Sequence, residues 1–224
     1  MAIGTLNEGA LHQQLKEWYR LPDDLLEQRV GGYVIDLVRG EILVEFQTGG
    51  FAPLRRKLAA LVAEHPVRLV APVPLTRRIV RVDDSGEILS ERRSPKRGRP
   101  EDVFARLVSF PALLCDGRFE LEVVLTHQQE LRVFRAGRAY RRKGWVVTGR
   151  SLMSDEQTVP LRTPADAAAL LPTGLPEVFD TAELAEAARI PRRLAQQMAF
   201  CLRAMGVLEP AGKRGRASLH TLVT

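Results

Sequence analysis

The stretch YVIDLVRGEILVEFQ, residues 33–47, decides the fold of this chain. Tyr33–Val38 and Ile42–Gln47 alternate large apolar side chains with other residues, and a tight turn at Arg39-Gly40 separates them. This pattern predicts two short strands joined in a hairpin. One face of the hairpin is apolar throughout, and we expect it to lie in the core; its residues are Tyr33, Ile35, Leu37, Ile42, Val44 and Phe46.

The opposite face of the hairpin carries two acids, Asp36 and Glu45. If the loop has an even number of residues, their carboxylates are opposite or diagonal neighbours. Carboxylates that close repel each other unless a cation lies between them, and such oxygen ligands suit Mg²⁺. We therefore predict a metal site here, with Gln47 placed to orient a water or a phosphate oxygen. The alternative is a solvated strand face with ordinary charges.

Helix and strand signals flank the hairpin. An amphipathic helix is predicted over residues 7–19, with Leu11, Leu15 and Trp18 on its inward stripe. A second helix follows Pro53, and Val67–Val73 is predicted as a buried strand, so the strand–helix–strand unit should form a right-handed crossover in a partly parallel sheet.

Glu8 stands at the start of the first helix, at the N-terminal end of its inward stripe. In that position it is a candidate third acid beside Asp36 and Glu45. The pattern Thr5-x-x-Glu8 is also that of a capping box, in which Glu8 only caps its own helix. Both interpretations remain open from the sequence.

The order of helix with Glu8, strand with Asp36, strand with Glu45-Phe46-Gln47, helix and strand resembles the PD-(D/E)XK nuclease superfamily core, over residues 5–75. The resemblance implies a restriction-endonuclease-like mixed sheet, of α+β or α/β class, in which Asp36 and Glu45 hold Mg²⁺ or Mn²⁺ and Glu8 assists. Gln47 replaces the usual Lys, and a Gln can hydrogen-bond but cannot carry charge or act as a base. Ile35 replaces the Pro that often precedes the Asp. The resemblance is compatible with an active enzyme and with a DNA-binding relic.

Basic charge is gathered into stretches of the chain. Among 224 residues, 33 are Lys or Arg and 27 are Asp or Glu, which gives a net charge of +6. Residues 132–150 hold seven basic residues and no acid, and residues 189–224 hold seven basic residues with Glu209 as the one acid. Clustered cations are what a phosphate-binding surface requires, so we expect a nucleic-acid partner.

Several classes of protein are disfavoured. No apolar run approaches the roughly 18 residues of a membrane-spanning helix. The N-terminus has no basic start followed by an apolar stretch, as a secretory signal would have. Cys115 and Cys201 lie far apart without a C-x-x-C motif, which supports neither a disulfide framework nor a zinc site. We expect a cytoplasmic protein with no membrane association.

The middle of the chain is predicted to be β-rich. Asp83-Asp84-Ser85-Gly86 is typical of a hairpin turn between Ile79–Val82 and Glu87–Ser90, and further strands are expected at Glu120–Thr126 and Leu131–Phe134. Residues 138–145 mix cations with Tyr140 and Trp145, a combination that binds phosphates and stacks on bases; the alternative is a solvated hairpin with Trp145 in the core. Phosphate contacts are predicted at Arg55, Arg56, Lys57, Lys96, Arg97, Arg141, Arg142 and Lys143.

The C-terminal part resembles a winged helix-turn-helix over about residues 177–224. Asp180-x-x-Glu183 is a capping box that opens a short helix, and Pro191 starts a second helix with Cys201 on its apolar stripe. A β-hairpin with a basic tip follows. The resemblance implies that the second helix enters the major groove while the hairpin tip contacts the backbone. The predicted DNA contacts are Arg192, Gln196 and Arg203 on the helix, beside the small Ala199, and Lys213, Arg214 and Arg216 on the tip.

Three segments follow from these patterns: a nuclease-like core at 1–75, a basic β-rich extension at 76–172 and a winged helix at 176–224. The expected function is that of a metal-dependent nuclease that hydrolyses phosphodiester bonds in DNA. The alternative is a DNA-binding regulator or accessory protein without catalysis, and RNA remains open as the substrate. Many nucleases of this kind act as homodimers, although the sequence carries no interface signature.

Overall fold

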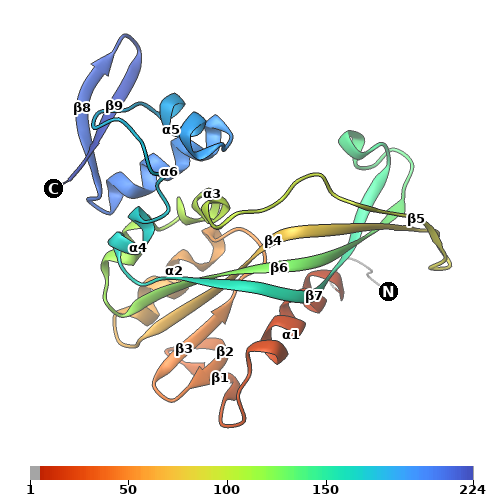
Figure 1. Cartoon of the computed structure of the whole chain (residues 1–224). Helices are drawn as coiled ribbons and strands as arrows, with labels where there is room; N and C mark the ends of the chain where they lie inside the picture. Colours follow the sequence, from red (N-terminus) through yellow and green to blue (C-terminus); the bar gives the residue numbers. More distant parts are fainter. Residues whose placement is uncertain (1–5, 224) are drawn as a thin grey trace.

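The computed structural model describes residues 6–223, with side chains from residue 9 onward. The protein is a mixed α+β structure built on a seven-stranded sheet, with a separate two-stranded sheet near the C-terminus (Figure 1). The large sheet has the order β1-β2-β3-β4-β6-β7, and β5 pairs with β4. Its strands are β1 (Leu25–Val30), β2 (Tyr33–Arg39), β3 (Ile42–Phe46), β4 (Val67–Val82), β5 (Ile88–Arg93), β6 (Phe119–Phe134) and β7 (Trp145–Leu161).

The first part of the chain runs α1 (Leu6–Tyr19), β1, β2, β3, α2 (Arg55–Val62) and β4, with a 3₁₀ turn η1 (Ala52–Leu54) before α2. Strands β1 to β3 are antiparallel neighbours, and β4 is parallel to β3. The predicted helices, hairpin and following strand are confirmed. Strand β1 was not predicted, because it is an edge strand whose mostly exposed residues give no alternating apolar signal.

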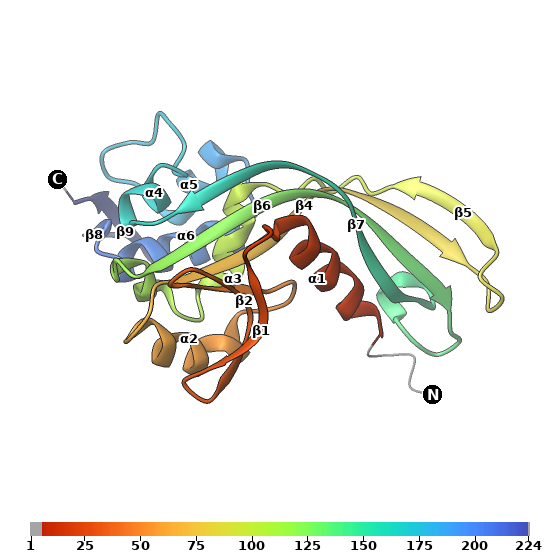
Figure 2. The same ribbon diagram turned by 90° about the horizontal axis from the view of Figure 1, so that it is seen from below.

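The two faces of the sheet are both buried, which corrects the expectation of a single core face. Helix α1 lies across one face of the sheet (Figure 2). Leu37, Val44 and Phe46 are buried in one cluster with Leu11 and Leu15 of α1, as predicted. Leu43 and Ile35, however, belong to a larger cluster on the other face, with α2 and the C-terminal helices. Trp18, predicted on the inward stripe of α1, is 39% exposed.

Strands β4, β6 and β7 are each continuous over 16 or 17 residues, where the sequence predicted shorter strands or none. Strand β4 continues through Pro72 and Pro74 because the polar backbone atoms of both residues face an open edge. Pro72 O accepts from the guanidinium of Arg106, and Pro74 O accepts from the N–H of Gly98. Pairing with β3 has ended at Val70, and pairing with β5 begins only at Arg78, so no neighbouring strand needs the missing N–H donors.

Beyond the end of β3 the three long strands project as an arm, defined here as residues 71–93, 123–134 and 145–159. The stretch of β4 from residue 71 to 82 alone spans about 40 Å at the usual rise of a strand. The predicted hairpin at Asp83–Gly86 joins β4 to β5, and the loop with η4 (Tyr140–Arg142) joins β6 to β7 at the tip. The arm and the C-terminal helices lie at opposite ends of the molecule (Figure 1).

The remaining helical elements connect the sheet to the C-terminal part. They are η2 (Pro100–Val103), α3 (Phe104–Leu107), η3 (Pro111–Cys115), α4 (Pro164–Ala168), α5 (Thr181–Ala188) and α6 (Arg192–Ala204). The hairpin of β8 (Leu208–Arg214) and β9 (Ala217–Leu222) follows. The predicted capping box is confirmed, because Asp180 accepts from the N–H of Glu183 at 3.0 Å while Glu183 accepts from the N–H of Asp180 at 2.8 Å. A short bridge between Phe179 and His220 ties the start of α5 to the hairpin.

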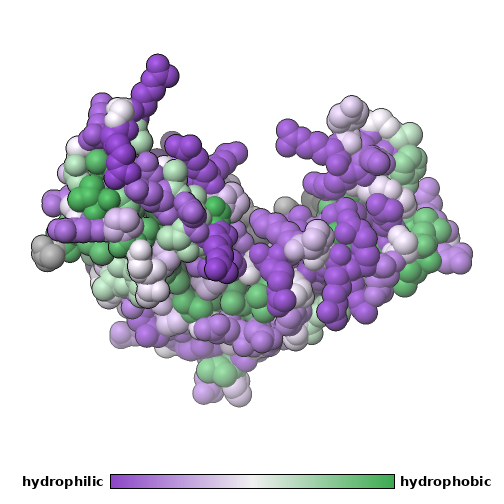
Figure 3. Space-filling model, turned by 45° about the horizontal axis from the view of Figure 1, so that its top comes forward, coloured by the Kyte–Doolittle hydropathy of each residue, from purple (hydrophilic) through white to green (hydrophobic). Residues whose placement is uncertain are grey.

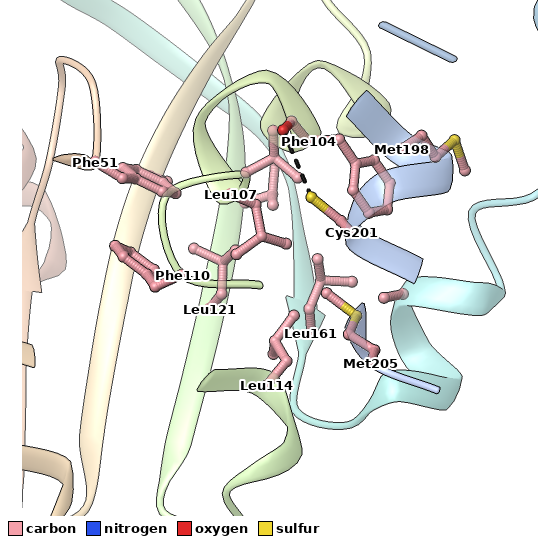
Figure 4. Close-up of a cluster of buried hydrophobic side chains, with 14 of the residues drawn as sticks. Phe51, Phe104, Leu107, Phe110, Leu114, Leu121, Leu161, Met198, Cys201 and Met205 are labelled. Atoms are coloured by element: carbon pink, nitrogen blue, oxygen red, sulfur yellow. Dashed lines mark hydrogen bonds between the residues drawn. The ribbon is translucent and has the colours of Figure 1, made fainter. Parts of the chain in front are cut away.

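The apolar stripe of α6 packs against α3 and the sheet, so the C-terminal helices share one buried cluster with the rest of the chain (Figure 4). Cys201 lies in this cluster, with its Sγ 3.9 Å from Phe104 O, and burial raises the pKa of its thiol to about 12. It is therefore a core residue, as predicted. Ala199 was predicted on the exposed face of α6 but is buried, and the adjacent Phe200 is exposed instead.

Across residues 6–223, none of the helices is both long enough and apolar enough to span a membrane.

Candidate functional site

Strands β2 and β3 separate from each other at Asp36 and Glu45. Their pairing extends from Arg39 opposite Ile42 to Leu37 opposite Val44, around a two-residue turn. From Ile35 back to Tyr33, β2 pairs only with β1, while β3 continues beside β4. Asp36 and Glu45 are the first residues past the last pair, so both carboxylates lie at the fork between the strands.

Each carboxylate accepts a hydrogen bond from the backbone of the neighbouring strand. The N–H of Phe46 donates to Asp36 Oδ2 at 2.9 Å, and the N–H of Asp36 donates to Glu45 Oε1 at 3.4 Å. The predicted juxtaposition of Asp36 and Glu45 is therefore confirmed. Part of their role is structural, because each carboxylate satisfies a backbone N–H at the point where the β2–β3 ladder ends.

Three basic side chains surround the carboxylates. Asp36 Oδ2 lies 3.0 Å from His12 Nε2, and Asp36 Oδ1 lies 3.9 Å from Lys16 Nζ, both on α1. Glu45 Oε1 lies 2.6 Å from Lys57 Nζ on α2. From the sequence, Lys57 is predicted only as a phosphate contact, and no role is predicted for His12 or Lys16.

A signal for the helical side of the site was present in the sequence. Glu8, His12 and Lys16 recur every four residues, which places them on one face of α1, one turn apart. The side chain of Glu8 lies outside the described residues, so its predicted role as an assisting acid stays a prediction. The position of Lys57 depends on how α2 packs, and no local pattern reports it.

Among the described residues, the side chain of Gln47 makes no hydrogen bond to Asp36 or Glu45. Its backbone N–H donates to Val70 O, and its side-chain amide donates to Gly50 O at 2.6 Å. The backbone carbonyl of Gln47 accepts a hydrogen bond from the guanidinium of Arg106 at 3.3 Å. The amide therefore braces the loop after β3, which differs from the expectation that Gln47 points with Glu45 toward a bound water or phosphate.

The environments of the two acids push their pKa values in opposite directions. Burial raises the pKa of Asp36, but the hydrogen bonds from His12 and from the N–H of Phe46 outweigh it, so the pKa is lowered overall. Burial dominates at Glu45 and keeps its pKa above the ordinary value, although the contact with Lys57 lowers it. Asp36 is thus held ionised, while Glu45 retains its proton to a higher pH than an exposed Glu would.

Two neighbouring carboxylates offer oxygen donors of the kind that a hard cation prefers. Between residues 9 and 223, the structure contains no group of three or more His, Cys, Asp or Glu side chains arranged to hold a metal ion. Asp36 and Glu45 would supply one or two carboxylate ligands, and water or a substrate phosphate would supply the rest, which is the usual arrangement for Mg²⁺.

Removing the charge of Lys57 should raise the pKa of Glu45 further, because Lys57 is the main group that opposes burial there. We expect a Lys57→Met variant to titrate Glu45 at a higher pH than wild type, as measured by NMR of the Glu carboxyl carbons. Arg56→Met is the matched control, since Arg56 is the exposed neighbour on α2 and should leave that titration unchanged. Equal titration in wild type and Lys57→Met would contradict the assigned ion pair.

The other predicted phosphate contacts lie on the surface. Arg55 and Arg56 are exposed at the start of α2, Lys96 and Arg97 are exposed in the loop after β5, and the basic residues of η4 are exposed at the arm tip. Trp145 is half buried, edge-to-face with Phe134 at 5.7 Å, so its indole packs within the arm, whereas Tyr140 is 96% exposed.

The predicted contacts of the C-terminal part are also exposed, on α6 and at the tip of the β8–β9 hairpin. Arg214 differs from the others because its guanidinium is held 2.7 Å from Glu183 Oε1 of α5. Viewed from the side of these helices, the molecule is hollowed between two raised ends, and hydrophilic side chains line much of the hollow (Figure 3).

Comparison with known proteins places the site within a family. The chain is 30% identical over 223 residues to a protein described as uncharacterized from Treponema pallidum (strain Nichols), and the match covers 98% of this chain and 87% of that protein. No solved structure matches. A family model, described as a domain of unknown function (DUF8091), matches residues 9–162, from α1 to the end of β7. The candidate site and the arm lie within that span, and the chain belongs to the DUF8091 family.

Proposed function

We propose that this protein is a metal-dependent nuclease that hydrolyses phosphodiester bonds in DNA. The observation that carries the proposal is the meeting of Asp36 and Glu45 at the fork between β2 and β3. The surrounding element order, α1-β1-β2-β3-α2-β4 with β3 parallel to β4, supports it, because it agrees with the nuclease core that the sequence resembles.

Asp36 and Glu45 would hold Mg²⁺ or Mn²⁺ at the fork. The metal would lower the pKa of a bound water to generate the attacking hydroxide and would offset charge on the phosphate. His12 and Lys16 keep Asp36 ionised and oriented toward the fork. Lys57 is the cation nearest to Glu45, so it can place positive charge beside a scissile phosphate, a charge that Gln47 lacks.

The basic surfaces on either side of the hollow would hold the DNA. The exposed face of α6 and the hairpin tip form one side, and the tip of the arm forms the other. Their contacts would be mainly to phosphates, which position a duplex without reading its sequence.

The test is cleavage of a plasmid and of a panel of duplex, single-stranded and branched DNAs, with Mg²⁺ or Mn²⁺ and with a chelator. We expect cutting that depends on the metal and stops when the chelator is added. A wild-type protein that binds these DNAs and cuts none of them with either metal would refute the nuclease. Competition between matched DNA and RNA duplexes decides which nucleic acid is preferred, and sedimentation decides between monomer and homodimer.

A second candidate function is a DNA-binding regulator that lacks catalysis. It is favoured by the side chains at the fork, because Lys57 already occupies Glu45 Oε1 at 2.6 Å and the Gln47 amide donates to Gly50 O. This candidate requires DNA binding that is indifferent to Mg²⁺ and to Glu45→Ala. The nuclease requires both to matter for cleavage.

A further inference from the structure

An arginine cluster occupies one face of the arm, formed by Arg77 and Arg81 of β4, Arg132 of β6 and Arg150 of β7. Strand pairing brings them together, since Arg81 lies opposite Arg132 and Arg150 lies opposite Glu130. Alternation along β4 and β6 directs Arg77, Arg81, Glu130 and Arg132 to the same face. None of these four arginines was among the predicted phosphate contacts.

Glu130 is the one acid that the arginine cluster contacts among the described residues. Its side chain is 2% exposed, and its oxygens lie 2.6 Å from Arg132 Nη2, 3.2 Å from Arg150 Nε and 3.4 Å from Arg77 Nη1. Three of the four guanidinium groups therefore share one carboxylate, which leaves an excess of positive charge in the arginine cluster.

The arginine cluster also holds unused hydrogen-bond donors. Nε of Arg77 and Nε of Arg81 are buried, and neither has a hydrogen-bond partner among the described residues. Arg81 contacts no carboxylate there, and its guanidinium stacks on the ring of Trp145 at 4.5 Å. Burial lowers the pKa of Arg77, and the positive charges of Arg150 and Arg132 lower it further. Such an arrangement is costly unless an anion joins it, because like charges repel and buried donors lose their bonds to water.

The face that carries the arginine cluster is the face that α1 covers nearer the fork. Leu152 of β7 lies opposite Gln128, two residues from the Arg150–Glu130 pair. Its side chain packs against the apolar side chains under α1. Its N–H donates to Gln14 of α1 at 2.7 Å. Asp36 meets His12 of the same helix, so α1 connects the arginine cluster to the candidate site.

We propose that the arginine cluster is a binding site for the phosphate backbone of DNA. This inference rests on the proposed function and adds to it the track on which the substrate approaches. A guanidinium presents a planar fork of donors that matches two phosphate oxygens, and several of them side by side suit successive phosphates of one strand. DNA bound there lies along the arm and leads toward the fork at Asp36 and Glu45.

The test is DNA binding as a function of salt, measured by fluorescence anisotropy on a labelled duplex with a chelator present so that cleavage cannot interfere. Arg77→Gln and Arg150→Gln should each weaken binding about tenfold and should each reduce the slope of log affinity against log salt by about 1. Arg150→Gln leaves Glu130 with two arginines, Arg77 and Arg132, so it decides the question if Arg77→Gln does not fold.

Arg78→Gln is the matched control. Arg78 is the next residue on β4, points to the opposite face, is exposed and pairs with Glu91 at 2.8 Å. Its removal changes the net charge by the same amount and should leave affinity and salt slope close to wild type. An equal loss in Arg78→Gln would overturn the proposal, because it would show that only overall charge matters.

The remaining outcomes separate this inference from the nuclease. If wild type cleaves DNA and the cluster variants bind as wild type does, the inference fails and the nuclease stands. If the cluster variants lose binding while wild type cleaves nothing, the inference stands and the nuclease fails. If wild type does not bind DNA, both fail. Tighter binding to a matched RNA duplex than to DNA would overturn the assignment of DNA as the occupant.

Discussion

Replacing Glu45 with Ala or Gln should abolish metal-dependent cleavage of DNA, with a loss in rate on the order of a thousandfold or more, or about 4 kcal/mol of transition-state stabilisation. The reason is that Glu45 would supply one of the two carboxylates that meet at the fork among the described residues. Glu45→Gln is the sharper variant, because the amide keeps the shape of the side chain and can still accept from the N–H of Asp36, whereas it binds a divalent cation poorly.

Glu41→Gln provides the control for the Glu45 variants. Glu41 lies in the exposed turn of the same hairpin, so the Glu41→Gln variant should cleave DNA at the wild-type rate. The comparison also excludes a contaminating nuclease, which would cut equally in all preparations. Full activity in Glu45→Gln would remove Glu45 from the metal site and leave the Asp36–Glu45 pair as a structural device at the end of the β2–β3 ladder.

Replacing Phe104 with Ala should destabilise the whole chain by about 3–5 kcal/mol, the usual cost of emptying a large buried site. Phe104 is fully buried in α3, where it packs in the cluster that α6 shares with the sheet (Figure 4). Because the loss falls on a shared core, we expect a single unfolding transition in urea, shifted to lower denaturant and detected equally by fluorescence and circular dichroism.

Phe200→Ala is the matched control, because it makes the same substitution at an exposed position. Phe200 lies one residue before Cys201 on α6 and is 54% exposed, so its removal should change stability by no more than about 0.5 kcal/mol. Two separate transitions, with only one of them shifted by Phe104→Ala, would show that the C-terminal helices fold apart from the sheet.

The sequence predicted the elements whose signals are local. The helix at 7–19, the hairpin at 33–47 and the capping box at Asp180 and Glu183 each depend on alternation, helical spacing or a short motif. A hairpin loop with an even number of residues places Asp36 and Glu45 next to each other, and the two-residue loop confirms this prediction. These features needed no knowledge of distant parts of the chain.

The features that the sequence did not predict depend on pairing across long separations. Strand β4 continues past its two prolines because β6 pairs with it along its length, and β6 lies about 50 residues away. Lys57 reaches Glu45 only through the packing of α2. The arginine cluster joins residues of β4, β6 and β7, and no window of sequence contains them together.

The open edge of β4 at Pro72 and Pro74 has a consequence for how the protein behaves at high concentration. A long strand with a free edge ordinarily templates pairing with another chain, which leads to domain swapping or fibrillar aggregation. Here the prolines remove two donors from that edge, and Arg106 and Gly98 occupy the carbonyl acceptors. At these two residues an incoming strand finds neither a donor nor a free acceptor, so this stretch of the β4 edge is protected against pairing with further copies of the chain.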